Sequence, residues 1–375
     1  MKLIYILLLS SLVIIYSGCK ERTETRKDLI SIDMNQYEKV DFNSMIKSVS
    51  SIKLKHDSIP TFEYCHKIIQ NNNYYYLLVH NRTGYEVLIF DDSGELVNQI
   101  AFKDLHYFIN TMFIHSKENQ LWIICEQNSL YKYKLDGTFL EKTSLPISCV
   151  EIAELNDQNF LVYDGGFNMD WEHNIALTNM KNVEKFFLRK NKNMPKSFLQ
   201  NIFTSGTGNN DIYVFPKMVD TIYHYNTKEK MMEPFCHLNF HGDFLTEKMI
   251  PKDRYFSDKE MSDIITEKKY IYAHGNFKKA SNKLFFSVSG KRNNYYIINL
   301  TDNSLKYFDT LFDGYISRDS FLGSNGEDLL MVTKEGLLAS YYRNKESSYP
   351  SFQEEMSKMS EEGNSWVLLN IKIKE

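Results

Sequence analysis

Residues 73–102 read NYYYLLVHNRTGYEVLIFDDSGELVNQIAF, and residues 119–145 read NQLWIICEQNSLYKYKLDGTFLEKTSL. Each segment contains an apolar strand-like run, a polar loop and a second run in which apolar and polar residues alternate. A turn with a glycine (Gly94 or Gly137) and another strand-like run follow. Short runs rich in aromatic and β-branched residues are typical of strands, and glycine supplies the positive φ that a tight hairpin needs. The two segments therefore predict one repeated unit of antiparallel strands.

The unit recurs toward the C-terminus. Its predicted third strands end at residues spaced by 43, 45, 47 and 73 positions, namely Phe90, Tyr133, Thr178, Tyr225 and Ile298. A period of about 45 residues with four short strands is the signature of a β-propeller blade. The spacing of 73 is one such period plus an insertion, which we place at residues 241–268.

The two ends of the chain are predicted to complete a last blade. Residues 48–55 (SVSSIKLK) form one strand before the first repeat, and three strands follow the fifth repeat, ending with residues 366–373 (WVLLNIKI). Pairing the N-terminal strand with the C-terminal one would close the ring and remove an open sheet edge. The prediction is an all-β, six-bladed β-propeller over residues 42–375, with four-stranded antiparallel blades and short helical insertions, including one over residues 354–362.

The composition agrees with a β protein and argues against nucleic acid as a partner. The chain holds 25 Tyr and 25 Phe, which suit pleated sheets. Its net charge is −4, and it lacks a Lys/Arg cluster, so nucleic acid is not expected as a partner. The cysteines of the body form no CxxC pair and predict no zinc site; whether they form disulfides is left open for Cys65, Cys125, Cys149 and Cys236.

The first nineteen residues, MKLIYILLLSSLVIIYSGC, predict export. The apolar core is too short to span a bilayer, and small residues precede Cys19, as in a bacterial lipoprotein signal. We expect residues 1–18 to be a signal peptide, Cys19 to carry the lipid, and residues 19–41 to form a flexible tether. Lys20 after the cysteine favours the outer membrane, on either face. The alternative is an ordinary signal peptide with an incidental cysteine.

In the order of its motifs, the chain resembles the six-bladed β-propeller lipoproteins of Bacteroidetes. The resemblance covers nearly all of the mature chain and departs at Ser365, where proline is expected. It rests on the segments SGC, IKSVSSIKL, FDDSGELVNQI, FPKMVDTIYHY and KKYIYAHGNFKKASNKLFFSVS, and on a closing strand after an acidic helix. It implies the fold and an envelope location, and it carries no catalytic residues over to this chain.

Two classes of function remain open. The sequence has no HExxH, GxSxG or Walker glycine loop, so we expect no catalytic residues, metal or cofactor. We favour a monomeric binding or scaffolding module for a glycan, peptide or partner protein. The alternative is a polysaccharide lyase or hydrolase with its site at the mouth of the central channel, which two nearby carboxylates or a His/Tyr/Arg cluster there would favour.

One face of the ring is predicted to carry the site. With blade strands A to D counted outward, the B–C and D–A connections share a face, which we call the insertion face. It holds both long connections, residues 241–268 and 335–363, while the turns at Gly94 and Gly137 lie opposite. Long loops on a rigid scaffold often carry function. Among the predicted ligand-binding residues, Trp171 is the strongest candidate, although it could instead pack under its own loop; the others are Arg82, Tyr85, Glu126, Asn128, Asp170, His173, Lys217, Lys291 and Arg292.

Overall fold

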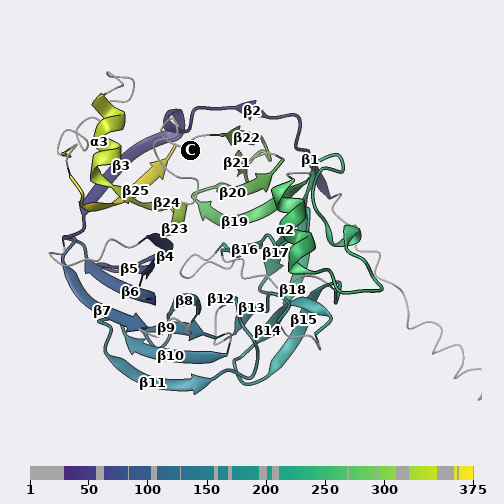
Figure 1. Cartoon of the computed structure of the whole chain (residues 1–375), viewed down its shortest axis with the longest axis horizontal. Helices are drawn as coiled ribbons and strands as arrows, with labels where there is room; N and C mark the ends of the chain where they lie inside the picture. Colours follow the sequence, from purple (N-terminus) through teal and green to yellow (C-terminus); the bar gives the residue numbers. More distant parts are fainter. Residues whose placement is uncertain are drawn as a thin grey trace, which may run out of the picture.

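Six small sheets surround a common axis in the computed structural model (Figure 1). The structure describes residues 29–55, 63–82, 84–102, 108–126, 128–155, 159–167, 171–193, 201–204, 211–267, 270–291, 294–309, 321–343, 359–360 and 363–374. Each sheet is one blade, and the blades follow one another around the ring in chain order. The predicted six-bladed β-propeller is confirmed.

The first three blades are antiparallel sheets of four consecutive strands. Blade 1 consists of β4 (Tyr64–Asn71), β5 (Tyr74–Asn81), β6 (Gly84–Asp91) and β7 (Leu96–Phe102). Blade 2 consists of β8 (Ile109–His115), β9 (Gln120–Cys125), β10 (Ser129–Lys134) and β11 (Phe139–Ser144). Blade 3 consists of β12 (Glu151–Glu154), β13 (Phe160–Tyr163), β14 (His173–Thr178) and β15 (Val183–Arg189).

Blades 4 and 5 each gain an outer strand from the start of the chain. Blade 4 contains β16 (Asp211–Val214), β17 (Thr221–Asn226) and β18 (Met231–Asn239), with Phe203 bridged to β16 on its inner side. Blade 5 contains β19 (Ile271–Ala280), β20 (Lys283–Gly290), β21 (Asn294–Asn299) and β22 (Leu305–Phe308). The added strands are β1 (Ile30–Asp33), parallel to β18, and β2 (Glu38–Lys39), parallel to β22.

These two strands correct the predicted tether. Residues 30–39 pack on the rim of the ring, so a flexible tether over all of residues 19–41 is wrong at its C-terminal end. Apolar residues alternate with polar ones in this otherwise polar stretch. Ile32 and Met34 are thereby buried against blades 4 and 5. The predicted signal peptide and Cys19 lie outside the described residues.

Blade 6 closes the ring as predicted. It consists of β23 (Phe321–Ser324), β24 (Asp328–Lys334), β25 (Trp366–Ile373) and, outermost, β3 (Ile46–Lys53), which is preceded by a 3-10 helix, η1 (Phe42–Met45). β3 pairs antiparallel with β25, with Ile52 opposite Leu368 and Val49 opposite Ile371. Strands more than 300 residues apart therefore form one sheet.

The core lies between the blades rather than at the centre of the ring. Among the described residues, six apolar clusters each join the facing sheets of two adjacent blades. In the cluster between blades 1 and 2, Tyr76 and Ile89 meet Met112 and Ile123. The structure shows Cys65, Cys125, Cys149 and Cys236 as free thiols; the last three are buried and behave as apolar residues, while Cys65 is half-buried.

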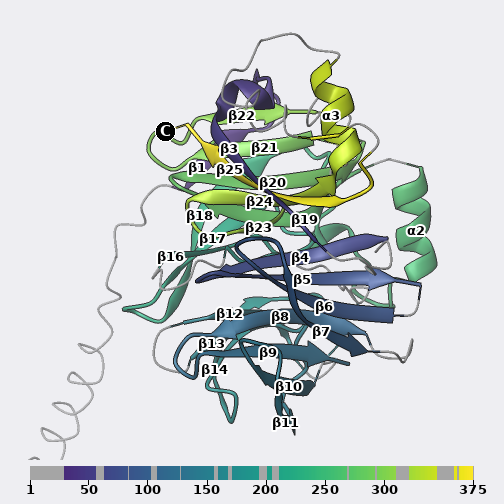
Figure 2. The same cartoon turned by 90° about the vertical axis from the view of Figure 1, so that its left-hand side faces the viewer.

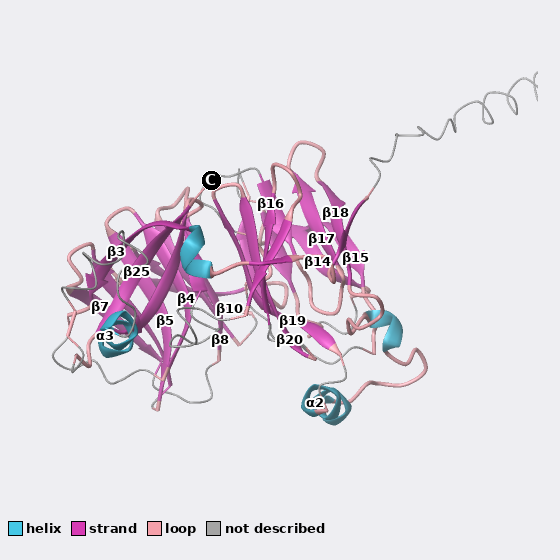
Figure 3. Cartoon of the chain, turned by 90° about the horizontal axis from the view of Figure 1, so that it is seen from above, coloured by secondary structure: helices cyan, strands magenta, loops and turns pink. Residues whose placement is uncertain are grey.

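Both long connections contain helices. The connection between blades 4 and 5 contains η3 (Glu247–Met249) and α2 (Asp258–Thr266), and the connection between β24 and β25 begins with α3 (Glu335–Arg343). The helix predicted over residues 354–362 lies almost wholly outside the described residues. Figures 2 and 3 show α2 and α3 on the same side of the ring, as the blade topology requires. In the described part of the chain, no helix is long and apolar enough to cross a membrane.

Candidate binding face and ring centre

The described residues of the predicted site lie in or next to loops of the insertion face, but they do not form one cluster. Antiparallel strands alternate in direction, so all B–C loops of the six blades open on the side of α2 and α3. The ring separates these loops, and contacts form mainly within a blade or between neighbours. Asp170 and Arg292 lie outside the described residues.

Blade 1 and the start of blade 2 form an aromatic cluster on this face. The Tyr85 ring lies 4.8 Å from His80, 5.5 Å from His66 and 5.5 Å from Phe108, measured between ring centroids. Burial lowers the pKa of His66, assisted by the nearby His80, and burial raises the pKa of Tyr85. Both groups therefore favour their neutral forms near pH 7.

His66 holds an unusual place on the inner strand of blade 1. The β4–β5 register shifts between Cys65 and Lys67, which leaves His66 as the extra residue of a β-bulge. Its Nε2 atom is buried and has no hydrogen-bond partner among the described residues. Because a bulge redirects a side chain, it places this imidazole beside the Tyr85 ring.

Charged and exposed groups border the cluster. Tyr64 begins β4 with 65 % of its surface exposed. The Arg82 side chain is 91 % exposed, and its Nε lies 3.5 Å from Glu63. Such an exposed ion pair adds little stability, so the Arg82 guanidinium is available to a ligand.

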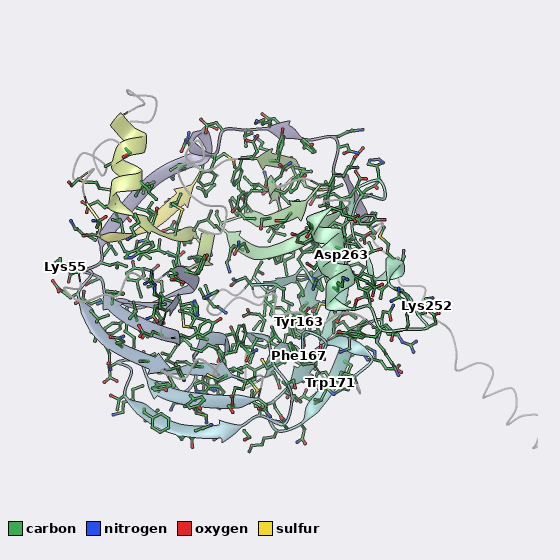
Figure 4. All side chains as sticks on the ribbon, in the orientation of Figure 1. Lys55, Tyr163, Phe167, Trp171, Lys252 and Asp263 are labelled. Atoms are coloured by element: carbon green, nitrogen blue, oxygen red, sulfur yellow. The ribbon has the colours of Figure 1, made fainter. Side chains whose placement is uncertain are left out.

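Blade 3 carries a second aromatic group. The Trp171 ring packs edge-on against Phe186 at 5.0 Å, and His173 stacks on Phe186 at 5.5 Å. Trp171 is half-buried and contacts the apolar cluster between blades 2 and 3, while Phe186 is 40 % exposed. Trp171 thus packs partly beneath its loop, and Phe186 is the more exposed ring, which the sequence analysis missed. Figure 4 shows Tyr163, Phe167 and Trp171 in order from the middle of blade 3 toward its rim.

Charged side chains border this aromatic group of blade 3. Glu172 accepts from Arg189 at 3.0 Å and lies 3.1 Å from Lys192. All three side chains are substantially exposed. An aromatic surface next to exposed charges is suited to stacking on a sugar ring or anchoring a peptide side chain.

The remaining predicted residues have mainly local roles. Glu126 adopts a positive φ of 50° and donates its backbone N–H to the Phe108 carbonyl at 2.9 Å. The Asn128 carbonyl accepts from the Leu145 amide at 2.7 Å. Lys217 is half-buried, and Lys291 forms an ion pair with Asp243 at 2.7 Å that ties blade 5 to its preceding insertion.

The insertion between blades 4 and 5 is docked on blade 3. Glu247 accepts from the Asn174 side chain at 3.1 Å and from the Asn191 backbone at 3.2 Å. Burial raises the pKa of Glu247, although these hydrogen bonds and Lys190 oppose the rise. Below α2, an apolar cluster joins the insertion to the blade 4 loop, and its members are Met218, Leu245, Ile250, Phe256 and Met261. The insertion is therefore a packed part of the face.

A polar network crosses the centre of the ring and was not predicted. The Lys67 ammonium of blade 1 lies 2.7 Å from the Glu151 carboxylate of blade 3 and donates to the Thr111 hydroxyl of blade 2 at 2.9 Å. Thr111 also donates to Glu151 at 3.0 Å. All three side chains are buried. Inner strands of blades that are not neighbours are thus joined directly.

The network continues into blades 4 and 5. The Asn201 backbone donates to the second oxygen of Glu151 at 2.9 Å, and the Lys278 ammonium donates to the Asn201 side-chain oxygen at 2.6 Å. Burial raises the pKa of Glu151, but the Lys67 charge and the hydrogen bonds outweigh burial and hold the pKa below its usual value. Burial, assisted by the Lys67 charge, lowers the pKa of Lys278 to about 7.

Repeated bulges help to shape this centre. The inner strands shift register before Lys67, before Thr111 and before Gly323, as well as on both sides of Gly275. Sequence reasoning missed the network because its contacts are distant along the chain. The three residues that bond directly to Glu151 lie 40 to 84 residues away from it in sequence. The available signal was the presence of charged residues in strands that line the centre of a propeller, namely Lys67 in β4, Glu151 in β12 and Lys278 in β19.

Among the described residues, no group of three or more His, Cys, Asp or Glu side chains could hold a metal ion. The ionisable groups of the described network are instead two ammonium groups, Lys67 and Lys278, and one carboxylate, Glu151.

A closed ring of six blades, five with four strands and one with five, and with long connections on one face, defines a six-bladed β-propeller. The sequence matches the family described as "6-bladed beta-propeller" over residues 20–312, and the chain belongs to this family. No curated protein matches the sequence.

Solved structures share the fold. A Bacteroides fragilis protein, named as a candidate exported protein, is similar with a TM-score of 0.71 and 18 % identity, over 92 % of this chain and 99 % of that one. BamB from Moraxella catarrhalis is similar with a TM-score of 0.38 and 11 % identity, over 69 % and 66 %. The WD40 domain of Neurospora crassa Pan2 reaches 0.40 and 8 %, over 83 % and 77 %. The last two scores support no argument about this chain.

Proposed function

We propose that this chain is a lipid-anchored envelope protein whose propeller binds a glycan, peptide or partner protein on its insertion face. The observation that carries the proposal is the exposure of aromatic rings on the side of α2 and α3. Tyr64 is 65 % exposed and Phe186 is 40 % exposed, each beside exposed charged groups. Rigid blades hold these rings without the entropy cost of ordering a loop.

A screen of the soluble body tests the binding role. The body should begin at residue 29, because β1 belongs to the ring. Glycan-array and pull-down experiments would identify a ligand, and Phe186→Ser together with Tyr64→Ser should weaken its binding at least tenfold. Phe139→Ser is the matched control: Phe139 is 55 % exposed but follows the Gly137 turn on the opposite face. Equal losses in both variants, or a loss only in the control, would reject the insertion face.

The envelope location is supported by the signal-like N-terminus and by the name of the similar Bacteroides fragilis protein. Cys19 supplies the thiol for the lipid, and several acyl chains bury enough methylene groups for stable attachment. Cys19→Ala should move the protein out of the membrane fraction or stall its processing. Wild-type membrane association of this variant would disprove the anchor.

One observation favours an enzyme as the second candidate. His66, on an inner strand, clusters with His80 and Tyr85, and Arg82 follows two residues after His80 in the adjoining loop. Such His, Tyr and Arg side chains are the kind that a lyase requires. The unpartnered Nε2 of a neutral His66 is suited to proton abstraction. Loss of polysaccharide cleavage in His66→Gln with retained binding would support this function, and absence of cleavage by the wild type would remove it.

A further inference from the structure

The charges at the ring centre do not balance. Lys67, Glu151 and Lys278 are buried, and two of these side chains are cationic when protonated while one is anionic. Cys149 is close to Glu151, but burial raises the pKa of its thiol, which therefore stays neutral. When Lys278 is protonated, the described part of this centre therefore has one positive charge in excess. A buried charge without a counter-charge is costly.

Hydrogen bonding is also incomplete on the cationic side. An ammonium group has three donors. Lys67 uses two of them, on Thr111 and Glu151, while Lys278 uses one, on Asn201, among the described residues. The two oxygens of Glu151 are already occupied by Lys67, Thr111 and the Asn201 amide. The unused groups are thus N–H donors that require an acceptor, and most of them belong to Lys278.

We propose that the ring centre binds a small oxyanion, with Lys278 as its principal contact and Lys67 as the second cation. An oxyanion such as sulfate, phosphate or a carboxylate supplies both the negative charge and the acceptor oxygens that the network lacks. The proposal does not depend on what the aromatic groups of the insertion face bind.

Binding should depend on the protonation of Lys278. The groups that face it are Asn201 on the inner segment of blade 4, Glu151 on β12 and Lys67 on β4. With a pKa of about 7, Lys278 is cationic at lower pH and neutral at higher pH. A bound anion favours the cationic form, so affinity should fall as pH rises through this range.

Sulfate is the probe of choice because its own charge is constant over the pH range used. The body from residue 29 is titrated with sulfate by calorimetry, at an ionic strength fixed by the same chloride concentration in every experiment. Concentrations near 10 mM are low enough to avoid the general stabilising effect of sulfate on proteins. We expect one saturable site, with an affinity at least about tenfold higher near pH 6 than near pH 9.

Two variants separate this site from adventitious binding. Lys278→Met should abolish the saturable sulfate signal, whereas Lys279→Met, on the same strand with a half-buried side chain, should retain it. If Lys278→Met does not fold, the pH dependence measured on the wild type remains the test. Absence of saturation, equal affinity at both pH values, or equal loss in both variants would overturn the proposal.

Discussion

The backbone amide of Lys55 donates a 2.7 Å hydrogen bond to the carbonyl of Gly94, which joins the end of the outer strand of blade 6 to a turn of blade 1. The side chain of Lys55 also forms an exposed ion pair of 2.9 Å with Glu95 at this junction. A turn that the sequence marks only as a tight hairpin thus also connects the first blade to the last.

Gly94→Ala should destabilise the ring at this junction. Gly94 has a φ of 81°, and an added Cβ would collide with the Lys53 carbonyl oxygen. We expect a loss of about 2–4 kcal/mol from backbone strain and displacement of the junction, measured by urea unfolding. Gly242→Ala is the control, because Gly242 has a φ of 85° and open space around its Cβ position. Equal losses in the two variants would show that the contact with Lys53 adds nothing.

Deleting residues 364–375 should destabilise every blade rather than fray one end. β25 lies between β24 and β3, so its loss removes two strand pairings and the link between the chain ends. Hydrogen exchange should show lost protection in blades 1 and 5 as well as in blade 6. Deleting residues 29–34 removes only an outer strand of blade 4 and is the comparison. Exchange changes confined to blade 6 after the first deletion would contradict closure by this pair.

Glu151→Gln should cost about 3–5 kcal/mol, because it leaves the Lys67 ammonium buried without its carboxylate. The double variant Lys67→Met with Glu151→Gln should be more stable than either single variant. A double-mutant cycle by thermal unfolding gives the coupling. Additive losses would mean that the two side chains do not act as a pair.

Stability should rise with pH through the titration of Lys278. Its pKa is about 7 in the folded chain against 10.5 for an ordinary lysine, so the unfolded chain binds more protons between these values. Its contribution is therefore present above the unfolded pKa and is lost as pH falls toward 7. The wild type should gain up to about 3 kcal/mol between about pH 7 and pH 9.5, relative to Lys278→Met, in sulfate-free buffer. Parallel pH profiles of the two proteins would refute the lowered pKa.

The fold was predictable because the signal repeats. Each blade carries alternating apolar runs and a turn glycine, and the predicted third-strand markers Phe90, Tyr133 and Thr178 all lie in third strands of the structure. The wrap of residues 30–39 was missed because four-residue and two-residue strands give too short a pattern, although Ile30, Ile32 and Met34 alternate.

For the site, the sequence predicted only which face of the ring carries the loops. Loop topology places residues on one side of the ring, but it does not determine which side chains meet. The pairing of Lys67 with Glu151 depends on two inner strands that converge from blades separated by a third. Phe186 was missed because it lies on an outer strand whose alternating pattern predicts only a solvent-facing position, with no indication of Trp171 above it.

The position of β1, β2 and β3 determines when this chain can finish folding. These strands are made first, yet their partners β18, β22 and β25 are synthesised roughly 200 to 320 residues later. As the chain is synthesised, these three strands keep open edges while the blades assemble behind them. Such long-range pairing slows folding and exposes strand edges to aggregation. The emerging chain should therefore depend on a holding chaperone until its last eight-residue strand arrives.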